Sequence, residues 1–265
     1  LYYYGARYYD PRTSIWQSVD PMADKYASSS PYDFTGDNPI TRIDPSGKNW
    51  FYYQAKNDKA RAWHWQKGNK ATYINSNGKK ATMTGGYRYL VTFTYDRGHT
   101  TAGGKRGTLT LYDQDKVLKS STAFSGAGWW AGGFDETAPG NYKMHLNPGD
   151  RTVMSKNSHV ESNDAENPPA TMGMQKIEDG TIITRPDGST HSVNSDYGNY
   201  RIRLHPTDGS RDRGLYLHGK DAWYNSRTHG CTCEKDEIIL EYIWEHQEIK
   251  GIVPFAVDQP ITTIN

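Results

Sequence analysis

The sequence has little cysteine and little apolar surface. Its 265 residues include only two cysteines, Cys231 and Cys233, and two cysteines separated by one residue cannot join distant parts of a fold. Apolar residues make up 35% of the chain, the mean hydropathy is −0.88, and no apolar run approaches the roughly 20 residues of a transmembrane helix. The fold must therefore be stabilised by packing, and we expect no insertion into a membrane.

An excess of charge of either sign is also absent. The chain has 31 basic and 30 acidic residues, so its formal net charge is +1. A balanced charge gives no strong attraction to nucleic acids or to anionic membranes. We therefore expect no nucleic-acid partner, and we expect partners to be recognised by shape and hydrogen bonding. Aromatic residues are abundant instead, with 20 Tyr and 8 Trp whose rings can bury a large area.

One stretch near the C-terminal end combines a nucleophile with bases. A His-Gly pair stands at His218 and Gly219, and Thr-His-Gly-Cys follows at Thr228–Cys231. A thiol is a strong nucleophile near neutral pH once a base such as imidazole takes its proton. Gly219 lets the backbone turn sharply at the end of a predicted strand, and Gly230 leaves backbone amides free to stabilise an oxyanion. The stretch therefore predicts cysteine-dependent acyl chemistry.

The residues after the cysteine predict an amphipathic helix over 234–241 and just beyond. Its apolar face is formed by Ile238, Ile239, Tyr242 and Ile243. Such a helix would place the Cys231 thiol near a helix N-terminus, where the positive end of the helix dipole lowers the pKa of a thiol.

These residues resemble the L,D-transpeptidase (YkuD-type) family, whose signature is an upstream His-Gly and a downstream Ser/Thr-His-Gly-Cys. The resemblance implies Cys231 as nucleophile and His218 as general base, with Thr228, His229 and Gly230 in the turn that shapes the oxyanion site. The segment between the two halves is shorter than is usual in that family. This shorter segment suggests a divergent loop over the site. Cys233 stands where an Arg or Asn commonly follows, so the resemblance does not imply a polar residue at this position that orients the nucleophile.

A second landmark of the same family lies far upstream. The segment Glu136–Met144 matches a Thr-Pro-x-Gly-x-Tyr turn and strand, although Ala138 interrupts the Thr-Pro pair. Period-two alternation predicts a hairpin over 87–95 and 107–112, and it predicts further strands. These are residues 117–124, 200–204, 214–218 and 252–257. The resemblance implies a mainly-β sandwich with one or two short helices over residues 87–265.

The first 47 residues differ in character from the rest. Short aromatic segments alternate with Asp-Pro and Asn-Pro turns, at residues 2–13, 15–21, 36–40 and 43–47. This stretch closely resembles the core-associated end of Rhs/YD-repeat proteins, whose repeats form a β shell and whose last Asp-Pro-x-Gly motif precedes a variable toxin. The chain begins in mid-motif with no visible signal peptide, which indicates a fragment or a processing product.

In many such proteins the toxin is released by self-cleavage at an aspartate pair. The resemblance implies Asp20 and Asp44 as that pair, because two carboxylates can share a proton for general acid–base work. The earlier motif reads Asp-Pro-Met-Ala rather than Asp-Pro-x-Gly, and Lys48 stands where an apolar residue is common. The alternative is that both aspartates only form turns.

Two other regions show no catalytic pattern. Residues 48–86 are aromatic but polar, which suggests a linker or pre-toxin segment between the Rhs-like part and the toxin domain at 87–265. His64, between two tryptophans, is expected to be packed rather than catalytic. Residues 147–196 are rich in turn-forming residues, which predicts surface loops or a hairpin insert rather than core.

The two resemblances together imply a function. The chain would be an antibacterial Rhs effector that needs no cofactor and acts on peptidoglycan stem peptides in the periplasm of a target bacterium. Its thioester chemistry would give L,D-transpeptidation, D-amino-acid exchange or L,D-carboxypeptidation. Expected partners are a cognate immunity protein, the Rhs shell and the secretion apparatus.

Three alternatives remain open at this point. His218, His229, Cys231 and Cys233 are four residues that could bind zinc, although Cys-x-Cys is tighter than the usual ligand spacing. The domain could be a non-enzymatic module that binds the cell wall through its tyrosines. It could also be a cysteine peptidase or amidase that uses the same dyad on another bond.

Overall fold

The chain divides into two compact units, Leu1–Gly47 and Lys48–Asn265. The computed structural model describes residues 2–3, 8–10, 12–13, 15–19, 48–68, 70–101, 104–126, 136–155, 160–161, 173–184, 188–210, 214–219, 231–234 and 236–262. The first unit contains a small antiparallel sheet of β1 (Tyr2–Tyr3), β2 (Tyr8–Asp10) and β3 (Ile15–Trp16). Asp20 and Asp44 lie outside the described residues, so the self-cleavage pair stays a prediction.

The larger unit is built on one mixed sheet. Its strands are β8 (Tyr89–Thr101), β9 (Gly104–Asp113), β10 (Lys116–Ser125), β11 (Gly140–His145), β12 (Arg151–Met154), β14 (Met174–Ile177), β17 (Tyr200–Arg203), β18 (His205–Pro206), β19 (Tyr216–His218), β20 (Thr232–Glu234) and β21 (Ile252–Val257). They are ordered β12-β14-β17-β19-β20-β10-β9-β8-β21-β11-β18. The prediction of a mainly-β fold is confirmed, and the alternating segments read from the sequence are strands.

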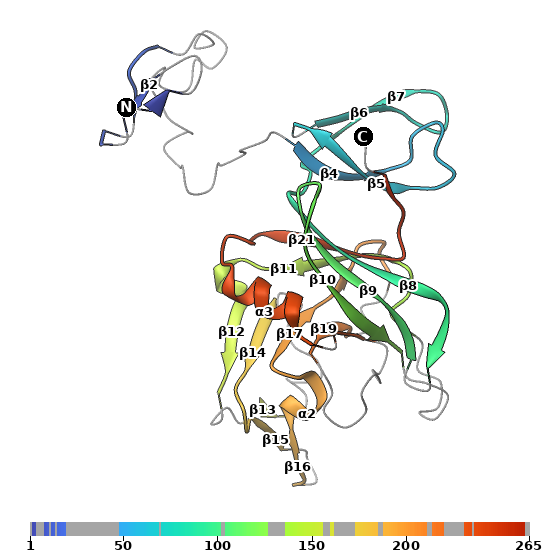
Figure 1. Ribbon diagram of the computed structural model, residues 1–265, viewed down its shortest axis with the longest axis vertical. Helices are drawn as coiled ribbons and strands as arrows, with labels where there is room; N and C mark the ends of the chain where they lie inside the picture. The colour runs from blue at the N-terminus through green and yellow to red at the C-terminus, as the bar shows by residue number, and fades with distance from the viewer. Residues whose placement is uncertain are drawn as a thin grey trace. The chain divides into compact units, whose positions relative to one another are not determined.

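The last strand in the sheet order, β18, follows β17 directly in the chain, and β17 is near the other end of that order. The sheet therefore curls so that its two ends approach each other. Leu204, between the two strands, donates its N–H to Leu215 O on the β19 side at 2.9 Å, and Thr207 N donates to Asn141 O on the β11 side at 3.1 Å. One bent segment therefore pairs with β19 at one end and with β11 at the other. Figure 1 shows β11 and β21 running across β8, β9 and β10 as the sheet curls.

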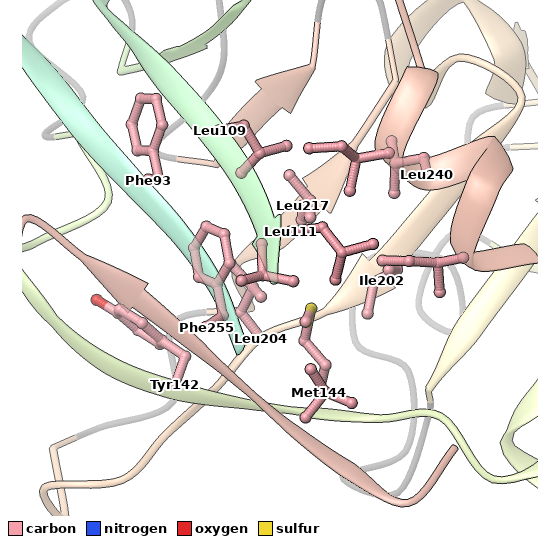
Figure 2. Close-up of a cluster of buried hydrophobic side chains, with 14 of the residues drawn as sticks. Phe93, Leu109, Leu111, Tyr142, Met144, Ile202, Leu204, Leu217, Leu240 and Phe255 are labelled. Carbon is pink, nitrogen blue, oxygen red and sulfur yellow. The ribbon is translucent and has the colours of Figure 1, made fainter. Parts of the chain in front are cut away.

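The curled sheet encloses the main apolar core. Strands that are far apart in the sheet order contribute side chains to it, and Figure 2 shows them converging. They include Phe93, Leu109, Leu111, Met144, Ile202, Leu204, Leu217 and Phe255, all 0% exposed. Each such side chain stabilises the fold by roughly 1.5–3 kcal/mol relative to an exposed one. This core fixes the strands on which the candidate site lies.

Helix α3 (Ile238–Glu245) covers one end of the core with Ile239, Leu240 and Ile243. The buried carboxylate of Glu234 accepts hydrogen bonds from Ile239 N at 2.7 Å and Leu240 N at 3.0 Å, so it caps the helix from the preceding strand. The expected helix exists, but its predicted start at residue 234 is wrong. Strand β20 lies between the cysteine and the helix. Glu234 belongs to this strand and caps the helix with its side chain, so it is not itself a helical residue.

The region 147–196 also differs from the expectation of surface loops. It contains a 3₁₀ turn (Pro148–Asp150), β12, β13 (Val160–Glu161), β14, β15 (Ile182–Thr184), β16 (Thr190–Ser192) and helix α2 (Val193–Tyr197). Met154, Ile177 and Val193 form a buried cluster of their own. The predicted hairpin is present as β15 and β16. The expectation that the region stays out of the core is wrong, because Met174 belongs to the main core.

Residues 48–86 belong to the same compact unit as the rest of the larger part. Strands β4 (Lys48–Tyr53) and β5 (Ala62–Lys67) pair with each other, and β22 (Ile261–Thr262) joins β5 from the far end of the chain. Strands β6 (Lys70–Ile74) and β7 (Lys80–Thr84) form a hairpin. The segment is thus fixed between both ends of the unit.

Two tryptophans attach this segment to the main sheet. The fully buried Trp50 donates its Nε1–H to Gln114 O at 2.7 Å, and Trp63 donates to Asn141 Oδ1 at 2.8 Å. His64 is 4% exposed and stacks on Tyr53 with ring centroids 4.0 Å apart, so it is packed as expected. In the described part of the chain, no helix is long and apolar enough to span a membrane.

Candidate active site

Three neighbouring strands carry the predicted nucleophile and base. Strands β19 and β20 are parallel and pair His218 with Cys233, and β17 is antiparallel to β19 and pairs Arg201 with His218. Paired residues point to the same side of a sheet, and successive residues alternate. One side therefore presents apolar residues to the core. The opposite side, which we call the thiol face, carries Arg201, Arg203, Tyr216, His218, Cys231 and Cys233.

Cys231 lies just before β20, level with Tyr216. Its Sγ accepts the backbone N–H of Tyr216 at 3.3 Å, and its carbonyl oxygen accepts Ser125 Oγ–H at 2.9 Å. Thr137 donates its N–H to the same Ser125 Oγ at 2.8 Å, and its hydroxyl lies 3.0 Å from that of Thr232. Thr137, which begins the upstream landmark, and Thr232, which follows Cys231, are 95 residues apart in sequence. The two sequence landmarks therefore meet beside the nucleophile.

The Cys231 thiol is protonated at neutral pH. Burial raises its pKa to about 11, although the Tyr216 N–H and the charges of Arg203 and Arg201 act in the opposite direction. The predicted lowering of this pKa by a helix N-terminus is therefore wrong. Cys231 is followed by a strand, and α3 begins only at Ile238, so the helix dipole does not reach the thiol.

His218 is neutral at the same pH. Burial lowers its pKa to about 4, and the positive charge of Arg201 lowers it further, against the effect of the hydrogen bond to Gly219. Its Nδ1 lies 2.8 Å from Gly219 O, an acceptor, so Nδ1 carries the proton and Nε2 keeps its lone pair. His218 pairs with Cys233, so Cys231, two residues before that partner, lies on the same side of the sheet as His218.

Gly219 is required by a close approach. Its N–H donates to both Tyr197 O and Tyr200 O at 2.9 Å, and the Glu237 carboxylate packs on its Cα. A Cβ at Gly219 would lie 1.5 Å from Glu237 Oε1. Glu237 is held by Asn199, which donates its N–H at 2.7 Å and its Nδ2–H at 2.8 Å. The glycine is needed for this packing rather than for a sharp turn alone.

Cys233 and His218 both contact the carbonyl oxygen of Gly219. The Cys233 Sγ donates to Gly219 O at 3.1 Å, so this oxygen accepts from both Cys233 and His218. Neither Cys231 nor Cys233 forms a disulfide. Two residues apart in an extended segment, they are separated by roughly 6.6 Å, whereas a disulfide needs Cβ atoms about 3.5–4.5 Å apart. Among the described residues no three His, Cys, Asp or Glu side chains form a group that could hold a metal ion.

Sequence reasoning missed two arginines on the thiol face. Arg201 is 1% exposed, donates its Nε–H to Gln175 Oε1 at 2.7 Å, and lies over the rings of Tyr197 and Tyr216 at 4.6 and 5.0 Å. Arg203 is also buried and lies over the Tyr216 ring at 5.3 Å. The signal was present in Tyr-Arg-Ile-Arg-Leu, where arginines alternate with apolar residues on a strand predicted to precede His218.

The structure brings together only part of the predicted site. Cys231, His218 and Gly219 lie close together as the motif implies. Thr228, His229 and Gly230 lie outside the described residues, so their roles in the oxyanion turn stay predictions.

A cavity of about 270 Å³ lies beyond the ends of β17 and β19, and its described lining includes no residue of the thiol face. Leu204 and Leu215 contribute to its wall, and they are the chain neighbours of Arg203 and Tyr216. The Ala138–Tyr142 segment, which follows Thr137, forms another wall. Successive residues of a strand face opposite sides, so Leu204 and Leu215 belong to the core side and the cavity is not part of the thiol face.

Comparison with known proteins identifies no family. No family model matches the chain. Over 48 residues the chain is 46% identical to salivary gland surface protein 1 of Aedes aegypti, a match that covers 18% of this chain. The chain spans about 1% of the length of that relative. This similarity is too short to assign a fold or an activity to the larger unit.

Proposed function

We propose that the larger unit is a cysteine acyltransferase that acts on peptidoglycan stem peptides, and that the protein is an antibacterial effector. The observation that carries the proposal is the placement of Cys231 and His218 on one face of adjacent strands, with His218 Nδ1 committed to Gly219 O. This leaves Nε2 as the base for the thiol. The resemblance to L,D-transpeptidases supplies the substrate class.

The resting state is a neutral thiol beside a neutral imidazole. The thiol proton therefore moves to His218 Nε2 as Sγ attacks the donor carbonyl, rather than before substrate binds. The C–N bond of the donor then breaks, and the imidazolium returns the proton to the leaving amine. The product is a Cys231 thioester plus the released terminal D-alanine.

The thioester is resolved by a second nucleophile. An amine attacks the thioester carbonyl, loses its proton to His218 Nε2 and forms a new amide, and the thiolate leaves and is reprotonated. Water in the same place gives a carboxylic acid. Cross-linking, D-amino-acid exchange and carboxypeptidation are thus three outcomes of one intermediate.

The experiment that tests this function is mass spectrometry of muropeptides. Purified sacculi are incubated with the protein or with its Cys231→Ala variant. We expect the wild-type protein to remove, exchange or cross-link at the terminal D-alanine of stem peptides, and the variant to change nothing. A peptidase or amidase that uses the same dyad would give products cut at another bond, and a binding module would leave every muropeptide unchanged.

The proposed compartment gives an independent test. Expression in the cytoplasm should be tolerated, and export by a signal peptide should kill, because assembled peptidoglycan lies outside the inner membrane. A cognate immunity protein would protect only when it too is exported. Toxicity confined to the cytoplasm would rule out a cell-wall target.

A further inference from the structure

We infer that Glu237 is a positioning residue for the base His218. Its carboxylate fixes the backbone of Gly219, and the carbonyl oxygen of Gly219 holds the imidazole through Nδ1. Glu237 would thus act through Gly219 and not on the substrate. The effect on catalysis rests on the proposed function, whereas the effect on the tautomer of His218 does not.

The first argument is the backbone conformation of Glu237. This residue stands just before α3 with a φ of +54° and a ψ of +18°, in the left-handed region. Apart from glycines, only Gln114, Glu237 and Asp258 have a positive φ among the described residues. A residue with a Cβ is disfavoured there, and such strain persists only where the surrounding contacts impose it, commonly at functional sites. The contacts that keep Glu237 in this conformation therefore outweigh the strain.

Those contacts are made by the carboxylate. Oε1 accepts the backbone N–H groups of Asn199 at 2.7 Å and Tyr200 at 3.3 Å, and Oε2 accepts Asn199 Nδ2–H at 2.8 Å. Burial raises the pKa of the Glu237 carboxyl, and these three hydrogen bonds oppose that effect. Glu237 thus ties the start of α3 to the turn between α2 and β17.

The second argument is the packing of the carboxylate against two glycines. A Cβ added at Gly219 would lie 1.5 Å from Glu237 Oε1, and one added at Gly198 would lie 2.4 Å from the same oxygen. The Cβ at Gly198 would also lie 2.8 Å from the Cα of Gly219. The two glycines and the carboxylate therefore pack together at one point, directly after His218 in the chain.

The third argument is the path from this point to the imidazole. The Gly219 N–H donates to Tyr197 O and Tyr200 O, both at 2.9 Å, and the N–H of Tyr200 is one of those that Glu237 binds. Gly219 O lies 2.8 Å from His218 Nδ1. The Gly219 backbone is therefore held at its N–H by the turn and at its Cα by the carboxylate, while its oxygen contacts the base.

The position of Gly219 O determines the tautomer of His218. A neutral imidazole carries one proton, and the hydrogen bond at one nitrogen selects which nitrogen holds it. With Gly219 O in place, the proton is on Nδ1, and Nε2 can take the thiol proton. If Gly219 shifts, the tautomer with its proton on Nε2 becomes populated, and this form cannot act as the base for Cys231. Glu237 therefore controls the fraction of molecules in which the base is ready.

The test measures tautomer and turnover separately. NMR of ¹⁵N-histidine-labelled protein at pH 7 reports the protonated ring nitrogen, and His218→Gln identifies the His218 signals. We expect the wild-type protein to show one tautomer, protonated at Nδ1. Glu237→Gly removes the carboxylate and the strain together, so it should show both tautomers at a nearly unchanged melting temperature. Its kcat for release of D-alanine from a purified tetrapeptide stem should fall roughly 10- to 100-fold at constant KM.

Two amide variants that differ by one methylene are the matched comparison. Glu237→Gln keeps an oxygen in the place of Oε1 and should retain one tautomer and most of kcat. Glu237→Asn tolerates the left-handed region but is too short to keep these contacts, so it should behave like Glu237→Gly and replaces that variant if it does not fold. If Glu237→Gln were as impaired as the other two, the charge rather than the position of the carboxylate would matter, and the inference would be wrong.

Two further variants test strain and charge at other positions. Gln114→Gly relieves the same left-handed conformation, with a φ of +59°, in the turn between β9 and β10. Glu241→Gln removes an exposed carboxylate from the same end of α3. Both should leave the tautomer of His218 and kcat unchanged, and an effect of either as large as that of Glu237→Gly would contradict the assignment.

The outcomes separate this inference from the proposed function. One Nδ1-protonated tautomer in both Glu237→Gly and Glu237→Asn, or an unchanged kcat in both, would overturn only the role of Glu237. A merely structural role would lower the melting temperature and leave the tautomer as it is. If the wild-type protein released no D-alanine, the proposed function would fall, and the NMR comparison would still decide whether Glu237 controls the tautomer of His218.

Discussion

The two faces of strands β17, β19 and β20 are equally buried but chemically opposite. On the core side, Ile202 and Leu217 are 0% exposed, and on the thiol face, Arg201 and His218 are 1% and 3% exposed. Burying apolar carbon stabilises a fold, whereas burying a cation or an imidazole costs free energy unless its polar atoms are hydrogen-bonded. The same strands thus contribute stability on one side and chemical reactivity on the other.

Burial on the thiol face determines the protonation states of Cys231 and His218. Burial disfavours charge on both partners, so it raises the pKa of the Cys231 thiol and lowers that of His218. A resting ion pair, which is common where a thiol is exposed near a cation, does not form. The proton can move only when a substrate carbonyl takes up the developing charge, which restricts the chemistry to bound donors.

The largest effect on activity should come from the thiol face. Cys231→Ala removes the nucleophile without leaving a large cavity, so acyl transfer should fall by at least about a thousandfold while the melting temperature stays within a few degrees of wild type. Muropeptide mass spectrometry and a thermal melt measure the two quantities. Retained activity in this variant would exclude the thioester mechanism.

The largest effect on stability should come from the core side of the same strand. Leu217→Ala should lower the free energy of unfolding by about 2–5 kcal/mol through lost burial and a cavity. Val117→Ala, at a site 57% exposed, is the matched control and should change it by about 0.5 kcal/mol or less. Denaturant titration gives both values. Equal losses of unfolding free energy in the two variants would mean that Leu217 contributes no more to stability than an exposed residue.

The pattern of residues predicted the core side well. Period-two alternation identified the strands from Tyr89 to Phe124 and from Ile252 to Val257, because each has one side in the core. It failed for 147–196, where turn-forming residues hide short strands such as β14. Buried residues such as Met154 and Ile177 are too few there to form a period, and only their tertiary partners make them core.

The thiol face was predicted only in part, for a physical reason. The motif identified Cys231, His218 and Gly219, because the chemistry requires those residue types in that order. The arginines were missed because an arginine on a strand is ordinarily exposed, and only β14 and α2 show that Arg201 is covered. The thiol's pKa was predicted with the wrong sign because three residues separate Glu234 from the start of α3.

The next prediction concerns the acid limit of stability. The pKa of His218 is about 4 in the folded protein, below its ordinary value of 6.5, so between these values the unfolded chain binds more protons. Stability should therefore be fully present above about pH 6.5 and fall by roughly 3 kcal/mol as the pH drops to 4. His218→Gln should lose this part of the dependence.

The measurement is the free energy of unfolding of both proteins at pH 7 and pH 4.5. Other titrating groups, including the buried carboxyls of Glu234 and Glu237, are common to both proteins and cancel in the difference. An identical pH dependence in wild type and variant would show that His218 is not buried in the neutral form. His218→Gln should also abolish acyl transfer at every pH, because it removes the base.

The smallest effect should come from Cys233, which acts through His218 as a positioning residue. Cys233→Ala removes the second donor to Gly219 O, so that this carbonyl is held less firmly and His218 Nδ1 is less well oriented. We expect kcat to fall a few-fold at constant KM, with a loss of about 1 kcal/mol or less in stability. Cys233→Ser keeps a donor at the same place and should restore most of kcat. A residue that only filled space would not show this rescue.

If Cys231→Ala and Cys233→Ala were equally damaging, and the purified protein carried stoichiometric zinc by elemental analysis, a metal centre would replace the thiol nucleophile at this face.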